Sequence, residues 1–144
     1  GGDLASCTVT QLAVFIENRA GRLADVCAAV SATGSNIVGF SIADEEGFGI
    51  FRLIVDRPEE ALARLREAGF MVKTREVLSV EVPHRPGGLS ETLRVFREAN
   101  LNVEYLYSIA ENLIVFLLDQ PAAGVAALRR AGIRLRRPKF TAEG

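Results

Sequence analysis

The sequence predicts an α+β protein built from two consecutive βαββαβ repeats, each with one antiparallel sheet and two helices on one sheet face. Two observations carry this prediction. The chain matches itself when it is shifted by 63 to 66 positions, and its apolar residues follow strand and helix periods in the same order in each half. With 144 residues, 49% of them hydrophobic, the chain is long enough for two small cores. We therefore expect two domains, at residues 8–76 and 77–140.

The internal repeat is the strongest signal. A shift of 66 positions aligns identical residues in the first part of each copy, and a shift of 63 aligns them in the second part. The change of shift falls at residues 43–47, whose polar residues are typical of a hairpin tip, where a change of length costs little. The aligned identities include Arg19, Gly21, Leu23 and Asn36 with Arg85, Gly87, Leu89 and Asn102, and Asp56, Pro58 and Gly69 with Asp119, Pro121 and Gly132.

Periodicity assigns the elements of the first copy in order. Strands are indicated by alternating apolar residues, and the first helix by apolar residues at Leu23, Val26, Cys27 and Val30. Pro58 suits the start of the second helix and Gly69 its end. The same order recurs from residue 77 to 137, so each copy is expected to be a separate ferredoxin-like sandwich. The expected elements are a strand at 10–16, a helix ending at 33–34, strands at 36–43 and 48–55, a helix at 58–69 and a strand at 70–75.

Some expected strands are apolar on both faces. The run from Leu113 to Leu118 has no polar residue, and Phe51, Leu53 and Val55 alternate with the equally apolar Ile50 and Ile54. Helices would cover only one face of such a sheet, so the other face needs a partner. We expect a homodimer, or a larger assembly, that stacks sheet on sheet.

Composition excludes several classes of partner. The 18 acidic and 17 basic residues nearly cancel, so no overall field attracts nucleic acid or an anionic membrane. No apolar stretch approaches the roughly 20 residues that cross a bilayer. The two cysteines, Cys7 and Cys27, have no metal-ligand spacing, so we expect no cofactor or metal and a cytoplasmic location.

One turn in each copy resembles a known ligand-binding signature. The first strand leads into Glu17-Asn18-Arg19-Ala20-Gly21-Arg22-Leu23, and its counterpart is Pro83-His84-Arg85-Pro86-Gly87-Gly88-Leu89. Both resemble the Asn/Asp-x-Pro-Gly-x-Leu signature of the ACT domain, a regulatory amino-acid-binding module, over nearly the whole chain, twice. The first copy departs from the signature by Ala20 in place of proline, and the second by His84 in place of Asn or Asp.

The resemblance implies a stand-alone sensor that binds a free amino acid, or a similar small carboxylate, without catalysis and acts on a regulated enzyme partner. ACT sites usually lie between two domains. Physical chemistry also supports a ligand-binding site at the turn. A glycine at a helix start lets a ligand approach, and free N–H groups there attract a carboxylate. The implied ligand-binding residues are Asn18, Arg19, Ala20, Gly21, Arg22, Leu23, Asn36 and Ile37 in the first copy, and His84, Arg85, Pro86, Gly87, Gly88, Leu89, Asn102 and Val103 in the second.

Plainer readings of these residues stay open. Asn18 can simply cap a helix, His84 can be a solvated loop residue, and Cys27 fits a core position better than a nucleophile. An RNA-binding or protein-interaction module is the alternative function, and an acyl-phosphate hydrolase using Arg19 and Asn36 fits weakly, because no general base is evident. The alternative module would use a C-terminal basic cluster of Arg129, Arg130, Arg134, Arg136, Arg137 and Lys139.

Overall fold

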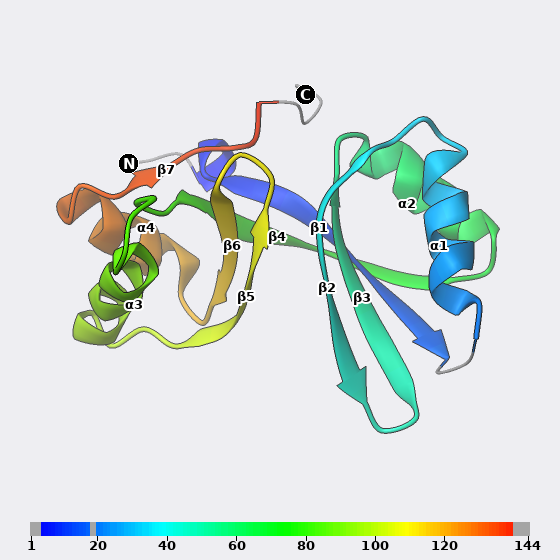
Figure 1. The fold of residues 1–144 in the computed structure, drawn as a ribbon, viewed down its shortest axis with the longest axis horizontal. Helices are drawn as coiled ribbons and strands as arrows, with labels where there is room; N and C mark the ends of the chain where they lie inside the picture. Colours follow the sequence, from blue (N-terminus) through cyan, green and yellow to red (C-terminus); the bar gives the residue numbers. More distant parts are fainter. Residues whose placement is uncertain (1–3, 18–19, 140–144) are drawn as a thin grey trace. The chain divides into compact units, whose positions relative to one another are not determined.

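The structure is a computed structural model that describes residues 4–17 and 20–139 (Figure 1). A short 3₁₀ helix at Leu4–Ser6 precedes the first strand. Each half shows the predicted order of strand, helix, strand, strand and helix. The elements are β1 (Thr8–Glu17), α1 (Arg22–Ser31), β2 (Ile37–Glu45), β3 (Phe48–Val55), α2 (Pro58–Glu67), β4 (Met71–Glu81), α3 (Gly88–Glu98), β5 (Val103–Ile109), β6 (Leu113–Leu118), α4 (Pro121–Arg130) and β7 (Arg134–Leu135).

The predicted fold class, two ferredoxin-like repeats with separate open sheets, is wrong. The strands pair in the order β1-β3-β2-β5-β6-β4-β7, and β1 also pairs with β4, so six strands form one closed sheet and β7 adds to β4. The pairs β1–β3, β2–β3, β5–β6 and β4–β6 are antiparallel. One physical reason lies in β4. The strands expected at 70–75 and from residue 77 are a single strand, because no glycine, proline or other turn residue interrupts Met71–Glu81.

The described chain divides into two compact units. One unit spans Thr10–Arg75, and the other contains Glu76–Lys139 together with the segment that ends at Val9. Cys7 shows why that early segment belongs with the later residues. Its carbonyl oxygen accepts a hydrogen bond of 2.8 Å from the Ser79 N–H, and its side chain, 1% exposed, is part of the second unit's core.

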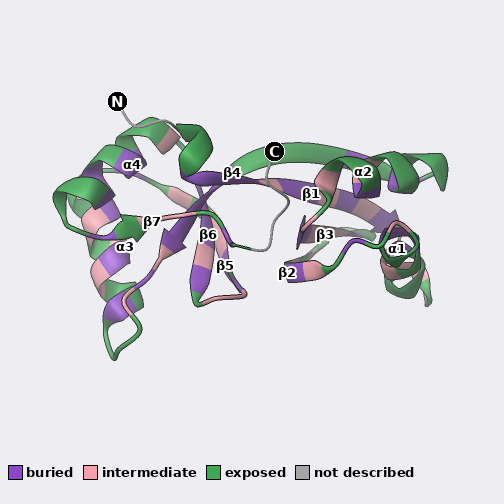
Figure 2. Ribbon diagram, turned by 90° about the horizontal axis from the view of Figure 1, so that it is seen from above, coloured by how far each residue is buried: buried purple, intermediate pink, exposed green. Residues whose placement is uncertain are grey.

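Each unit has its own core between its helices and one face of its strands (Figure 2). In the first unit, Leu12, Val14 and Leu53 are completely buried together with the helix residues Val26 and Leu65. In the second unit, the rings of Phe96 and Phe116 meet edge to face with centroids 5.3 Å apart. Both second helices begin with proline, as predicted, and no helix among the described residues is long and apolar enough to cross a membrane.

Strand β6 is buried on both faces. Phe116 and Leu118 belong to the helix-side core, while Leu113, Val115 and Leu117 point the other way and are also buried, at 0%, 0% and 6% exposed.

An ion-pair network holds the C-terminal segment. The Arg136 guanidinium donates to Glu81 at 2.7 Å and to Glu111 at 2.8 Å, and the Lys139 N–H also donates to the Glu111 carboxylate at 3.0 Å. The hydrogen bond from Arg136 is the main reason that the pKa of Glu81 lies below its ordinary value of 4.5. The segment after β7 is thus attached to both β4 and the β5–β6 turn.

We expect the Glu81→Gln variant to melt about 1–4 °C lower than the wild type at pH 7, because the variant keeps the hydrogen bond but loses the charge of a partly exposed pair. A lowered folded-state pKa means that this stabilisation is complete above pH 4.5 and is lost as pH falls through the lower value. Thermal melts between pH 7 and pH 3 measure the difference. Glu67→Gln, in the more exposed pair with Arg64, should change little at any pH, and a Glu81→Gln difference that persists unchanged in acid would contradict the assignment.

Candidate functional site

The first candidate turn surrounds the start of α1. Asn18 and Arg19 lie outside the described residues. Gly21 is the N-cap residue of the helix, in the left-handed conformation with φ at 88°, and as a glycine it has no side chain to cap the helix. Arg22 pairs with Asp25 at 3.0 Å and lies over the Phe70 ring at 4.4 Å, so its guanidinium is already engaged within the first unit.

The second candidate turn surrounds the start of α3 and repeats this geometry. Gly87 has φ at 85°, and again no side chain caps the helix. His84 and Pro86 are exposed, and Arg85 pairs with Glu91 at 2.7 Å. The turn therefore presents a glycine and exposed side chains, but the charge of Arg85 is already paired.

Gly88 differs from Gly87 in its surroundings. Its N–H donates to the Arg85 carbonyl at 2.9 Å, and a Cβ atom built on it would overlap the carbonyl oxygen of Pro83. A Cβ on Gly87 would meet nothing within 4 Å. The first copy carries Arg22 at the position of Gly88. The second copy therefore needs a glycine at position 88 because the main chain packs closely on Pro83. The start of the helix does not itself require a glycine at this position.

The two turns share a chemical capacity. Each helix begins at a left-handed glycine, which has no side chain of its own to accept hydrogen bonds from the first-turn N–H groups of α1 and α3. Such helix starts attract anions. Beside them, Leu23 and Leu89 are 40% and 37% exposed, which is a large exposure for leucine at matching positions of two copies. An anion with an apolar part suits this combination.

The predicted asparagines fix the start of each second strand. The Asn36 N–H donates to the Asp56 carboxylate at 2.8 Å, and the Asp56 N–H donates back to the Asn36 carbonyl at 3.1 Å. Asn102 and Asp119 make the same exchange at 3.0 and 3.1 Å. These contacts use the main chain of each asparagine. The role of the two aspartates was not predicted, although the repeat aligns them.

Ile37 and Val103 open the second strands next to these exchanges. Both are half-buried and pack against the core of their own unit. The register shifts just after each of them, between Ile37 and Gly39 and between Val103 and Tyr105. A bulge of this kind interrupts the regular ladder and is common near binding sites.

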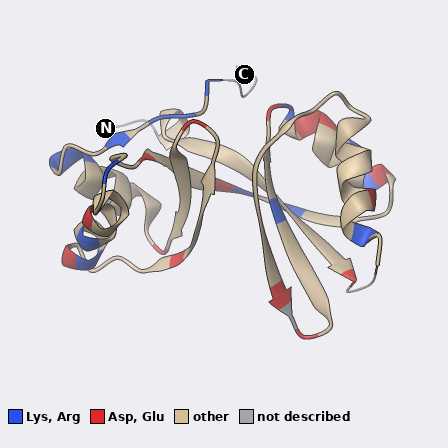
Figure 3. Ribbon diagram, in the orientation of Figure 1, with Lys and Arg blue, Asp and Glu red and all other residues tan. Residues whose placement is uncertain are grey.

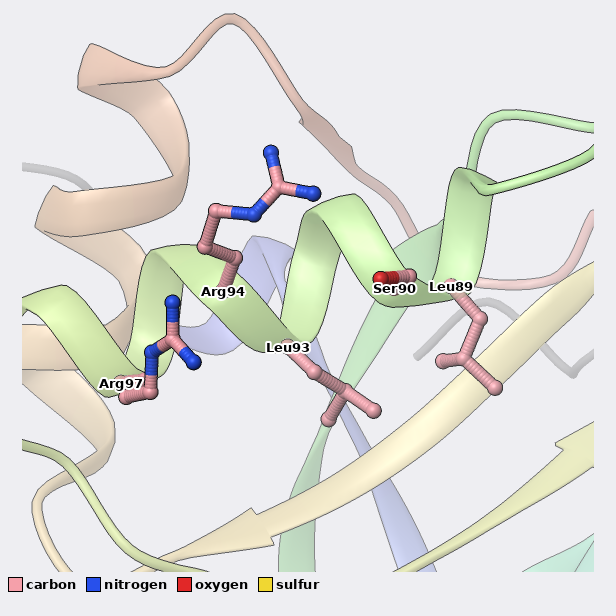
Figure 4. A pocket seen from close by; sticks show the side chains of 5 residues that line it. All are labelled: Leu89, Ser90, Leu93, Arg94 and Arg97. Atoms are coloured by element: carbon pink, nitrogen blue, oxygen red, sulfur yellow. The ribbon is translucent and has the colours of Figure 1, made fainter.

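Two of the surface hollows that border α3 contain predicted site residues. The first measures about 420 Å³ and lies among residues of α3 alone (Figure 4). The second measures about 430 Å³ and extends from α3 to the start of β5 and the end of β6. The first is lined by Leu89, Ser90, Leu93, Arg94 and Arg97, and the second by Leu93, Phe96, Arg97, Asn100, Leu101, Asn102, Val103 and Asp119.

The hollows divide the predicted residues of the second copy. Leu89 lines the first, and Asn102 and Val103 line the second, whereas the residues from His84 to Gly88 line neither. Arg97 and Asp119 were missed as site residues. The sequence contained one signal for Arg97, which is a difference between the copies: the first copy has Ser31 at the matching position.

The basic cluster proposed for the alternative function is partly neutralised. Arg136 is paired with Glu81 and Glu111, and Arg129 donates to the sulfur of Cys7 at 3.1 Å. Figure 3 marks basic residues blue and acidic residues red, and both colours occur on the helices. Among the described residues, no group of three or more His, Cys, Asp or Glu side chains could hold a metal ion.

Comparisons with known proteins identify a family. A family model described as "ACT domain pair" matches residues 7–129. A crystal structure of protein BT0572 from Bacteroides thetaiotaomicron is 28% identical, with a TM-score of 0.84 over 90% of this chain and 92% of that chain. The ligand-free regulatory subunit of aspartate kinase from Thermus thermophilus is 19% identical, with a TM-score of 0.63 over 92% of this chain and 95% of that chain. A search of the curated proteins found no match.

We expect Gly88→Ala to destabilise the protein by about 3 kcal/mol or more, because the new methyl group overlaps the main chain at Pro83. Gly87→Ala should cost only about 1–2 kcal/mol, since it meets open space and suffers only the unfavourable φ. Urea denaturation monitored by circular dichroism measures both. Equal effects of the two substitutions would contradict the packing role of Gly88.

Proposed function

This chain belongs to the family of ACT domain pairs, and from that premise we propose that it is a regulatory protein that binds a small molecule. The ligand is a free amino acid or a similar small carboxylate. It binds at the turns before α1 and α3 and at the starts of β2 and β5, with domains 8–76 and 77–140 as the two ligand-binding halves. The chain carries out no catalysis of its own.

One observation carries this proposal. In both copies the helix after the first strand begins at a left-handed glycine, Gly21 or Gly87, which has no side chain of its own to cap the helix. A carboxylate can approach such a glycine closely and accept hydrogen bonds from the first-turn N–H groups, aided by the helix dipole. The exposed Leu23 and Leu89 then lie beside the apolar part of the ligand.

The regulated partner is a second protein, most simply an enzyme. The regulatory subunit of aspartate kinase from Thermus thermophilus shares the fold, and its name describes a subunit that regulates an enzyme. By analogy, ligand binding here shifts the equilibrium between two states of the chain that differ in affinity for the partner. This linkage requires the ligand to bind one state more tightly than the other.

A screen of the twenty amino acids and common small carboxylates should find at least one compound that raises the melting temperature, because a ligand of the folded state stabilises it. Gly21→Ala or Gly87→Ala should reduce that shift, since the added methyl group stands where the ligand approaches. Differential scanning fluorimetry measures the shift. If no compound raises the melting temperature of the wild type, the proposal fails.

We also propose that the chain forms a homodimer through β2. Phe40 and Ile42 are 59% and 53% exposed, although they lie beside Leu53 and Phe51 of β3 on the core face of the first unit. Two neighbouring apolar side chains with this exposure are unusual on a monomer surface. A second copy of the chain presents the same pair and can cover it symmetrically.

Replacing both Phe40 and Ile42 by serine should convert a dimer into a monomer, because the exposed apolar pair that the second copy would cover is removed. Light scattering coupled to size-exclusion chromatography at micromolar concentration measures the mass. Met71→Ser is the matched control, since Met71 is 66% exposed but lies on β4. A wild-type protein that is monomeric at this concentration would refute the dimer.

A further inference from the structure

The first hollow contains two positive charges that nothing in the described chain neutralises. Arg94 and Arg97 line this hollow of about 420 Å³, and both side chains are exposed. Neither guanidinium has an ion-pair or hydrogen-bond partner among residues 4–17 and 20–139. By contrast, Arg85 in the same unit pairs with Glu91 at 2.7 Å. Two unpaired guanidinium groups one helical turn apart attract carboxylates.

The acidic residues of α3 do not compensate these charges. Glu91 lies one turn before Arg94, but its carboxylate is paired with Arg85. Glu98 lines a different hollow, together with residues of α4. The positive charge of the first hollow is therefore available to a group from outside the described chain.

Apolar side chains lie beside these charges. The lining of the first hollow is mostly apolar, since Leu89 is 37% exposed and Leu93 is half-buried. In Figure 4 the two leucines point to the same side of α3, and the guanidinium groups of Arg94 and Arg97 turn away from them. Leu89, Leu93 and Arg97 follow at intervals of four residues, so they form a stripe of about 12 Å along α3. A partner of this surface needs both apolar and negatively charged groups.

The shape of the first hollow favours a protein segment over a small molecule. All its lining residues belong to α3, so the hollow is an open surface along one helix. Small-molecule sites bury about 70–90% of the surface of their ligand, which the side of a single helix does not achieve. A second helix, in contrast, packs on such a surface with its own ridge of side chains.

The first copy shows that the fold does not require the two arginines. Its helix α1 has Ala28 at the position of Arg94 and Ser31 at the position of Arg97. Both helices nevertheless pack on the strands of their own unit. The two charges belong to the second copy alone, and the shared scaffold folds without them.

We propose that α3 docks an acidic, amphipathic helix of the protein that this chain regulates. Carboxylates of that helix pair with Arg94 and Arg97, and its aliphatic side chains pack on Leu89 and Leu93. This inference rests on the proposed function for the existence of a protein partner, and it names the docking surface and the chemistry of that partner. Because Leu89 also lies beside the turn at Gly87, a ligand bound at the turn and the docked helix share one side chain, which couples the two binding events.

The test measures binding of three synthetic helical peptides to the full chain by fluorescence anisotropy. The peptides share an alanine background with leucine at every fourth position, and differ only in the residues beside those leucines, which are glutamate, glutamine or lysine. The glutamate peptide should bind at least about fivefold more tightly than the glutamine peptide, and the lysine peptide should bind most weakly. Added salt should weaken binding of the glutamate peptide and leave that of the glutamine peptide unchanged.

Variants of the chain locate the surface. Arg94→Gln and Arg97→Gln should each weaken the glutamate peptide about threefold or more. The double variant Arg94→Glu with Arg97→Glu should reverse the preference, so that the lysine peptide binds more tightly than the glutamate peptide, and a misfolded chain would not produce this reversal. Leu89→Ser should weaken the glutamate and glutamine peptides alike. Arg64→Gln, which removes an exposed arginine of α2, is the matched control and should change nothing.

The outcomes separate this inference from the proposed function. If the wild type binds the three peptides equally, or if the double variant does not reverse the preference, the inference is overturned. If the double variant converts an oligomeric wild type into a monomer in light scattering, α3 contacts a second copy of the chain, and the inference is again overturned. The proposed function does not depend on these results, because it fails only if the screen of small carboxylates finds no ligand.

Discussion

Main-chain pairing of two long strands is the constraint on which the rest of this structure depends. Strand β4 runs without interruption from Met71 to Glu81, across the boundary between the two compact units, and β1 divides between them after Val9. The main-chain groups of β1 pair with β3 and with β4, and those of β4 pair with β6 and β7 as well. The closed order of six strands follows from this pairing.

Within that frame, one local contact positions the candidate sites in both copies. An aspartate at the end of one hairpin strand exchanges hydrogen bonds with the main chain of an asparagine at the start of the other. The exchange holds the beginning of β2 and of β5, where the ladder then bulges after Ile37 and Val103.

Duplication lets one scaffold support two different surfaces. Both copies start their first helix at a left-handed glycine, Gly21 or Gly87, because only glycine adopts that conformation without strain. Away from such constrained positions the copies differ. Exposed Phe40 and Ile42, for example, belong to the first unit.

The sequence by itself determined what depends on near neighbours along the chain. The periods of apolar residues determined the helices and strands, and Gly21 and Gly87 determined the helix starts. The repeated turn and the asparagine that follows it determined the resemblance to ACT domains, which the family match confirms. Only the tertiary structure decided the closed sheet and the hollow between Arg97 and Asp119. Strand pairing and the approach of residues 22 positions apart (119 − 97) are non-local, and no period or spacing along the chain records them.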